Sequence, residues 1–156
     1  MTIPIEFTIL GNPSSVNSTS IKKNTWKLLV EGASLDALSS TYPGGAKYPD
    51  TVAVKVFYFP VNNQYIDVDN GLKHTIDGLA EHILVNDRTV TRIITERFPL
   101  IPGASLIVPI GLGSHIAGAL SKAHTATPSS AGVTVQKTHV TAVKVESYFD
   151  NKGIFW

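Results

Sequence analysis

Residues 67–83 read DVDNGLKHTIDGLAEHI and join an acidic turn to a short amphipathic segment. From residue 72 to residue 83 the large apolar side chains recur with a helical period, so one narrow stripe of this helix is expected to face the core. The stripe contains Leu72, Ile76, Leu79 and Ile83, and the opposite flank contains Asp69, Lys73, Asp77 and Glu81. The pattern predicts a helix over 72–83 whose start is capped by Asp69 or Asn70.

Three carboxylates near this helix are candidates for a metal site. Asp67 and Asp69 are two residues apart, so they point to the same side of an extended segment, and Asp87 follows the end of the helix. Mg²⁺ prefers hard oxygen ligands and is usually shared between carboxylates and substrate phosphates. The residues therefore predict a Mg²⁺ site or, as the simpler alternative, a helix cap with a solvated polar face.

The order of these residues resembles the RusA-type Holliday-junction resolvases. The resembling motif is Asp67-x-Asp69-Asn70-x-x-Lys73, followed by Asp77 in the next helical turn and by Asp87 after a short turn. The segment IEFTI at 5–9 and the segment GNPSSVN at 11–17 are similar to that family's opening strand and Pro-x-Ser-x-Asn loop. The resemblance covers residues 3–98 in order and closes with a strand near 134–149.

The resemblance implies a fold and a set of site residues. The fold would be α+β: a mixed β-sheet with one or two packed helices in a single domain over 1–156, with an extra hairpin and helix inserted over 99–132. The metal-binding carboxylates would be Asp67, Asp69 and Asp87, binding Mg²⁺ or Mn²⁺, with Lys73 as the basic residue needed for cleavage. Asn70 and Asp77 would support these catalytic residues. DNA would contact Asn17, Lys22, Lys23, Arg88 and Arg97.

The function implied is resolution of four-way DNA junctions by paired nicks, in recombination and repair. A four-way junction is nearly two-fold symmetric, so a homodimer with one site per subunit suits it. Lys73 has a simpler alternative role, because it could pair with Asp69 and Asp77 along the helix.

Two positions depart from the family pattern. Asn86 stands where the family often has an additional aspartate, and NNQYI at 62–66 replaces the basic run before the first aspartate. The second departure weakens the expected affinity for junctions and favours an alternative function. In that alternative the chain is a non-catalytic DNA-binding or assembly protein that keeps the RusA-like fold.

Length and composition set the class of protein. The 156 residues suffice for one domain with a substantial core, and the absence of cysteine excludes disulfides and thiolate metal sites. Charge is nearly balanced, with 13 basic and 12 acidic residues, so DNA binding would need a local basic cluster. The most apolar stretch, 100–120, is interrupted by prolines and glycines, and the N-terminal apolar run is broken by Pro4 and Glu6. We therefore expect a soluble cytoplasmic protein without a membrane span.

Alternation of apolar residues predicts the remaining elements. Strands are expected over 3–10, 51–60, 89–98 and 133–149, and the strand over 51–60 should be central because both of its faces are apolar. A helix is expected over 21–38. Its buried side should contain Trp26, Leu29, Val30 and Leu35.

The inserted segment imitates a dinucleotide-binding turn. A strand over 105–110, the sequence Gly111-Leu112-Gly113 and a helix over 114–124 follow one another. The third glycine is misplaced at Gly118, and no acidic residue occurs between Gly118 and Lys144. We therefore expect no nucleotide cofactor, and expect the insertion to pack as an extra hairpin and helix or to cover a subunit interface.

Overall fold

The computed structural model of the chain describes residues 3–15, 17–41, 45–60, 66–98, 113–123 and 139–150. Within these ranges the fold is α+β, with a four-stranded mixed sheet and three α-helices. The elements are β1 (Ile5–Leu10), α1 (Ser20–Thr41), β2 (Val52–Phe59), α2 (Leu72–His82), the 3₁₀ helix η2 (Asp87–Thr89), β3 (Val90–Arg97), α3 (Ser114–Ala123) and β4 (Val140–Ser147). The strands fall inside the four predicted ranges and each α-helix matches a predicted one, whereas η2 was not predicted.

The sheet has the order β1-β4-β2-β3 and places β2 between two neighbours. β4 is antiparallel to both β1 and β2, whereas β3 is parallel to β2. Every residue from Val52 to Phe59 is buried, which confirms the central strand. Because parallel neighbours need a crossover connection, the chain leaves β2, returns along α2 and enters β3 beside the start of β2. The acidic turn therefore lies between β2 and α2.

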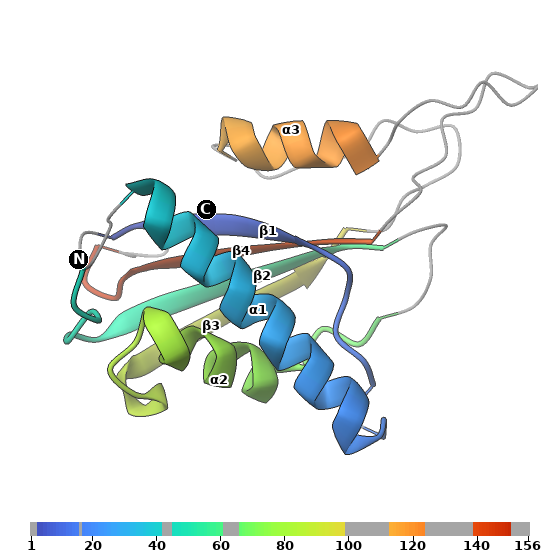
Figure 1. The fold of residues 1–156 in the computed structure, drawn as a ribbon, viewed down its shortest axis with the longest axis horizontal. Coiled ribbons are helices and arrows are strands. Elements are labelled where there is room, and N and C mark those ends of the chain that lie inside the picture. Colours follow the sequence, from blue (N-terminus) through green and yellow to red (C-terminus); the bar gives the residue numbers. More distant parts are fainter. Residues whose placement is uncertain are drawn as a thin grey trace, which may run out of the picture.

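Helices cover the sheet from two sides (Figure 1). α1 and α2 pack on the face formed by alternate residues of β2, including Val54, Val56 and Tyr58. α3 covers part of the other face, where Ile116 and Leu120 meet Phe57, Phe59, Val140 and Ala142. The two helices of the first face approach closely at Gly78, where an added Cβ atom would lie 2.8 Å from Cβ of Val30.

The buried side of α1 differs in part from the prediction. Trp26 and Val30 are buried as expected, but the predictions for Leu29 and Leu35 are wrong, because each is 45% exposed. The buried stripe instead advances four residues at a time through Trp26, Val30, Ser34 and Leu38. Ser34 can take a core position because its hydroxyl donates a hydrogen bond of 2.8 Å to the backbone carbonyl of Glu31.

Several predictions lie outside the described residues. These are the strand over 105–110, the turn residues Gly111 and Leu112, and the replaced basic run at 62–65. Among the helices that the structure does describe, none has the length and apolar character needed to cross a membrane.

Candidate functional site

The acidic motif forms a tight turn that ends in a left-handed glycine. The backbone N–H of Asn70 donates to the carbonyl of Asp67 over 3.0 Å, and Gly71 follows with φ +67°. Gly71 itself occupies the cap position of α2, and no side chain caps the helix, so the prediction of a cap by Asp69 or Asn70 is wrong. Asn70 instead turns inward and is 7% exposed, while Asp67 and Asp69 remain exposed.

Two side chains of the sheet hold this turn. The phenol of Tyr58 in β2 donates to the carbonyl of Asn70 over 2.9 Å, and the hydroxyl of Thr95 in β3 donates to the carbonyl of Val68 over 2.6 Å. Burial raises the pKa of Tyr58; a hydrogen bond with Thr95 acts against this, and the negative charge of Asp69 adds to it. Tyr58 is therefore a neutral hydrogen-bond donor. The influence of Asp69 on Tyr58 also places the Asp69 carboxylate near the carboxyl ends of the parallel strands β2 and β3.

The loop after β1 packs against the other side of the turn. An added Cβ atom on Gly71 would lie 2.2 Å from Cβ of Pro13 and 3.3 Å from Cδ1 of Trp26. The indole N–H of Trp26 donates to the Thr75 hydroxyl over 2.9 Å, and that hydroxyl donates to the carbonyl of Gly71 over 2.8 Å. The opening loop and the acidic turn, which are more than fifty residues apart in the sequence, are thus one structural unit.

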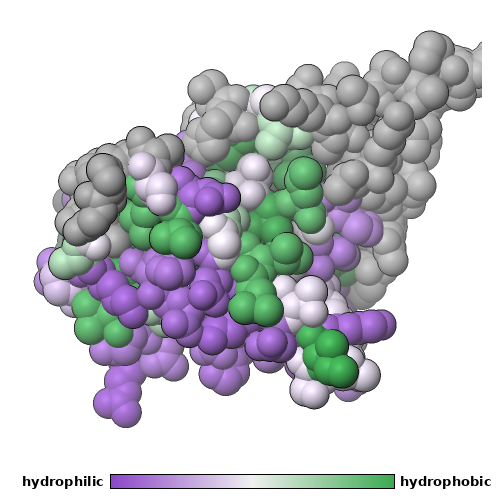
Figure 2. Space-filling model, in the orientation of Figure 1, coloured by the Kyte–Doolittle hydropathy of each residue, from purple (hydrophilic) through white to green (hydrophobic). Residues whose placement is uncertain are grey.

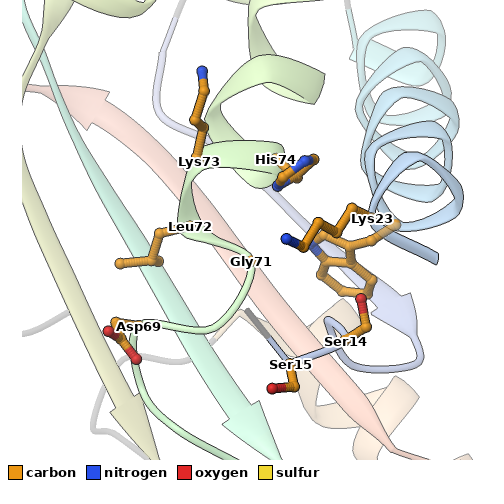
Figure 3. Close-up of a pocket in the computed structure, with 9 residues that line it drawn as sticks. Ser14, Ser15, Lys23, Asp69, Gly71, Leu72, Lys73 and His74 are labelled. Atoms are coloured by element: carbon orange, nitrogen blue, oxygen red, sulfur yellow. The ribbon is translucent and has the colours of Figure 1, made fainter. Parts of the chain in front are cut away.

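Two hollows lie beside the loop after β1. Both are lined by Ser14 and Ser15 of this loop and by Trp26 of α1. The smaller hollow has a volume of about 140 Å³ and is shown in Figure 3; its other lining residues are Lys23, Asp69, Gly71, Leu72, Lys73 and His74. The larger one has a volume of about 460 Å³; its other lining residues are Asn12, Pro13, Ser18, Lys22, Thr25, Leu29, Ile66 and Asn70. Lysines and carboxylate or amide groups therefore meet around one loop.

Two buried polar atoms at the larger hollow have no hydrogen-bond partner among the described residues. They are Oγ of Ser14 and Oδ1 of Asn70. A buried polar atom without a partner is costly, and such atoms are rare outside sites that bind water, ions or ligands. From the sequence, the hydroxyls near Asn17 in this loop could bind phosphate, but Ser14 was not singled out, and Trp26, Tyr58, Thr75 and Thr95 were missed. Their roles arise from long-range contacts.

Lys73 and Asp77, both predicted site residues, contact each other. The ammonium of Lys73 lies 3.2 Å from a carboxylate oxygen of Asp77, four residues later on α2, and the lysine side chain is 76% exposed. Figure 3 shows Lys73 pointing away from Asp69, whereas Lys23 reaches from α1 toward His74. Lys73 therefore pairs along the helix, as in the simpler alternative, but with Asp77 and not with Asp69.

Asp87 lies apart from the other two predicted metal ligands. It begins η2 just before β3, and β3 starts beside Val52 at the beginning of β2. Val68 contacts Thr95, five residues along β3 from Val90, which is about 16 Å at 3.3 Å per residue. Across the described ranges no three His, Asp or Glu side chains are grouped closely enough to hold a metal ion. Asp67 and Asp69 thus lie in a hydrogen-bonded turn rather than in the extended segment predicted for them, and Asp87 lies at the other end of α2.

The predicted DNA contacts divide in the same way. Lys22 and Lys23 line the hollows beside the acidic turn, and Asn17 is exposed on the same loop, where its N–H donates to the Ser15 hydroxyl over 3.3 Å. Arg97 pairs in register with Tyr58 at the same end of the sheet. Arg88, which is exposed in η2 beside Asp87, lies at the opposite end.

The hard oxygen donors at the turn suit Mg²⁺ that is shared with a substrate. Asp67 and Asp69 provide exposed carboxylates, and Asn70 provides a buried carbonyl oxygen without a partner. Mg²⁺ is commonly bound by one or two carboxylates together with phosphate oxygens and water.

Comparison with models of known protein families gives no match, and no curated protein sequence matches the chain.

Proposed function

We propose that this chain is a Mg²⁺-dependent endodeoxyribonuclease of the RusA type that nicks branched DNA such as four-way junctions. It would act in the cytoplasm as a homodimer in recombination or repair, with Mn²⁺ as a possible substitute for Mg²⁺. The observation that carries the proposal is the contact between the acidic turn and the loop after β1. This contact brings Asp69, Asn70 and the α1 lysines Lys22 and Lys23 to the edges of the same loop.

The chain supplies groups suited to a phosphodiester. Lys22 and Lys23 project from the start of α1, where the helix dipole also favours anions. The Ser14 hydroxyl is unpartnered and can donate to a phosphate oxygen. Asp67 and Asp69 would hold Mg²⁺ beside this surface. When bound, Mg²⁺ polarises a phosphate oxygen and lowers the pKa of a water molecule.

The protein residues would position the DNA and exclude alternative geometries. Tyr58 and Thr95 bind backbone carbonyls of the turn, so the backbone that carries the two carboxylates is tied to the sheet. The indole N–H of Trp26 ties α1 to α2 in the same way. Lys73, which is exposed and paired with Asp77, is available to a substrate only if it exchanges this partner for a phosphate.

A second function is favoured by the position of Asp87. If three carboxylates are required for cleavage, the separation of Asp87 from Asp67 and Asp69 leaves a DNA-binding or assembly protein without catalysis. The absence of the family's basic run before Asp67 points the same way.

Cleavage of a synthetic four-way junction separates these functions. Wild type, Asp69→Asn and the matched exposed variant Asp50→Asn would be compared on the junction and on a linear duplex, with Mg²⁺, Mn²⁺ or a chelator. The proposal expects paired metal-dependent nicks in the junction for wild type and Asp50→Asn and none for Asp69→Asn. Junction binding without cleavage in any metal supports the assembly protein instead. Asp87→Asn then tests the remote carboxylate, since loss of cutting would show that the assembled enzyme uses it.

A further inference from the structure

The outer face of α1 carries a stripe of large apolar side chains. Ile21, Leu28 and Leu35 are seven residues apart and are 77%, 55% and 45% exposed, and Leu29 beside them is 45% exposed. A spacing of seven residues places side chains on one side of a helix, here the side opposite the buried Trp26. Figure 2 shows hydrophobic side chains along this part of the surface, set among hydrophilic ones. Such a stripe on a long helix suits helix–helix packing.

Small residues lie within the same stripe. Thr25 and Gly32 are placed between the large side chains. Among the described residues, nothing beyond the helix's own adjacent backbone lies within 4 Å of the position that a Cβ on Gly32 would occupy. Glycine inside a helix lowers helix stability and is useful where another backbone approaches. The described part of the subunit therefore gives no packing reason for Gly32, whereas a second helix on this face would.

The charges beside the stripe indicate which helix fits. Lys22, Leu29 and Asp36 are again seven residues apart, and both charged residues are exposed. The basic residue is near the start of α1 and the acidic residue is near its end. Two parallel copies would bring like charges together, whereas two antiparallel copies would place each Lys22 beside Asp36 of the partner subunit.

We propose that two copies of this chain associate through the outer faces of α1, antiparallel, with the two-fold axis beside Leu28 and Leu29. In this arrangement the Thr25 layer of one helix meets the Gly32 layer of the other. The observations all lie on α1, so the inference holds whether or not the chain cuts DNA, and its tests use no nucleic acid. One helix pair is smaller than a standard interface, so the dimer should dissociate on dilution.

The arrangement also relates the two candidate sites. Lys22 and Leu29 line the larger hollow, so the partner helix would lie along its edge. With the two-fold axis between residues 28 and 29, the two Lys22 residues would be about 20 Å apart along the helix axis at 1.5 Å per residue. Two hollows facing the same groove at this spacing would give the dimer two equivalent binding positions.

Cysteine cross-linking tests the orientation directly, because the natural chain has no cysteine. Leu28→Cys should form a disulfide-linked dimer under mild oxidation, since residues 28 of the two helices would be adjacent. Ile21→Cys should not, because residues 21 would be about 22 Å apart along the axis. The matched control is Leu10→Cys, which is 65% exposed on β1. Linking at Ile21→Cys as strong as at Leu28→Cys would overturn the antiparallel arrangement, and linking no stronger than in Leu10→Cys would overturn the interface.

Charge reversal gives a second test by sedimentation equilibrium. Lys22→Asp and Asp36→Lys should each raise the dimer dissociation constant about 3–10-fold, because each variant creates two repulsive pairs. The double variant should return to within about twofold of wild type, since both pairs are restored with their signs exchanged. A double variant as weak as the product of the two single effects would refute the pairing. Wild type that stays monomeric at 1 mM, roughly the top of the range for weak complexes, would refute the association itself.

Discussion

Gly71→Ala should destabilise the protein more than any other single methyl group added to a glycine of the described structure. Gly71 has φ +67°, a left-handed conformation that costs an alanine about 1–2 kcal/mol. The new Cβ would also lie 2.2 Å from Cβ of Pro13 and 3.1 Å from its Cγ. Pro13 is buried and its ring is rigid, so it cannot rotate away as a flexible side chain would.

The two effects add to a substantial loss of stability. Overpacking of this kind costs about 1–3 kcal/mol, so the free energy of unfolding should fall by about 2–5 kcal/mol. This is a large share of the total free energy of unfolding of a typical domain, which is about 5–15 kcal/mol. Urea unfolding followed by circular dichroism measures it.

Gly32→Ala provides the matched control. The Cβ added at Gly32 in α1 meets no side chain of the described residues within 4 Å, so this change should raise the stability of the monomer by about 0.5–1 kcal/mol through helix propensity. Pro13→Gly removes the colliding atoms, so combined with Gly71→Ala it should recover about 1–3 kcal/mol relative to the sum of the single variants. The reasoning fails if Gly71→Ala unfolds within about 0.5 kcal/mol of wild type, the scatter of ordinary surface substitutions.

Three further predictions concern groups around the site and the sheet. Trp26→Phe removes the indole N–H that bonds a hydroxyl of α2, and should lower the free energy of urea unfolding by about 1–2 kcal/mol. The fully buried Lys55 ammonium lies 2.6 Å from a carboxylate oxygen of Glu146, and Glu146→Gln removes this counter-charge. Glu146→Gln should lower the free energy of urea unfolding by about 2–4 kcal/mol, which is more than Lys55→Met should lower it. The hydrogen bond from Lys27 holds the pKa of Glu81 below its usual 4.5, so the contact should stabilise the fold above that pH and lose its effect as the pH falls through the lowered pKa. The Tm difference between wild type and Glu81→Gln should therefore be present at about pH 6 and absent at about pH 3.

The sheet could be predicted from the sequence because its strands carry their signal locally. β2 is apolar on both faces over Val52–Phe59, and a strand of that kind has to be central. α2 was equally clear, because Ile76 and Leu79 recur with the helical period and are buried. In both elements the residues that the apolar pattern assigns to the core are the ones that the structure buries.

α1 shows where such patterns mislead. Its apolar residues are on two sides of the helix, so Leu29 and Leu35 could be assigned to the core from sequence without contradiction. Both Leu29 and Val30 were expected to be buried, and the close approach of α2 at Gly78 shows that Val30 alone of the two faces the core. If the outer leucines serve a second copy of the chain, the error has a physical reason: a helix that packs on two partners has two apolar faces.

The separation of Asp87 follows from the direction of α2, which residue spacing does not specify. An α-helix of 11 residues is about 16 Å long, and α2 carries the chain back from the carboxyl end of β2 to the start of β3. A carboxylate before this helix and one after it therefore lie at opposite ends, and the spacing Asp69 to Asp87 fits a shared ion only if the two residues belong to different chains or if the turn moves. Within one chain, a metal ion at Asp67 and Asp69 must complete its coordination with water and phosphate oxygens. Mg²⁺ or Mn²⁺ binding by the subunit should thus be weak without DNA and should be lost in Asp69→Asn, which isothermal titration with and without a junction would measure.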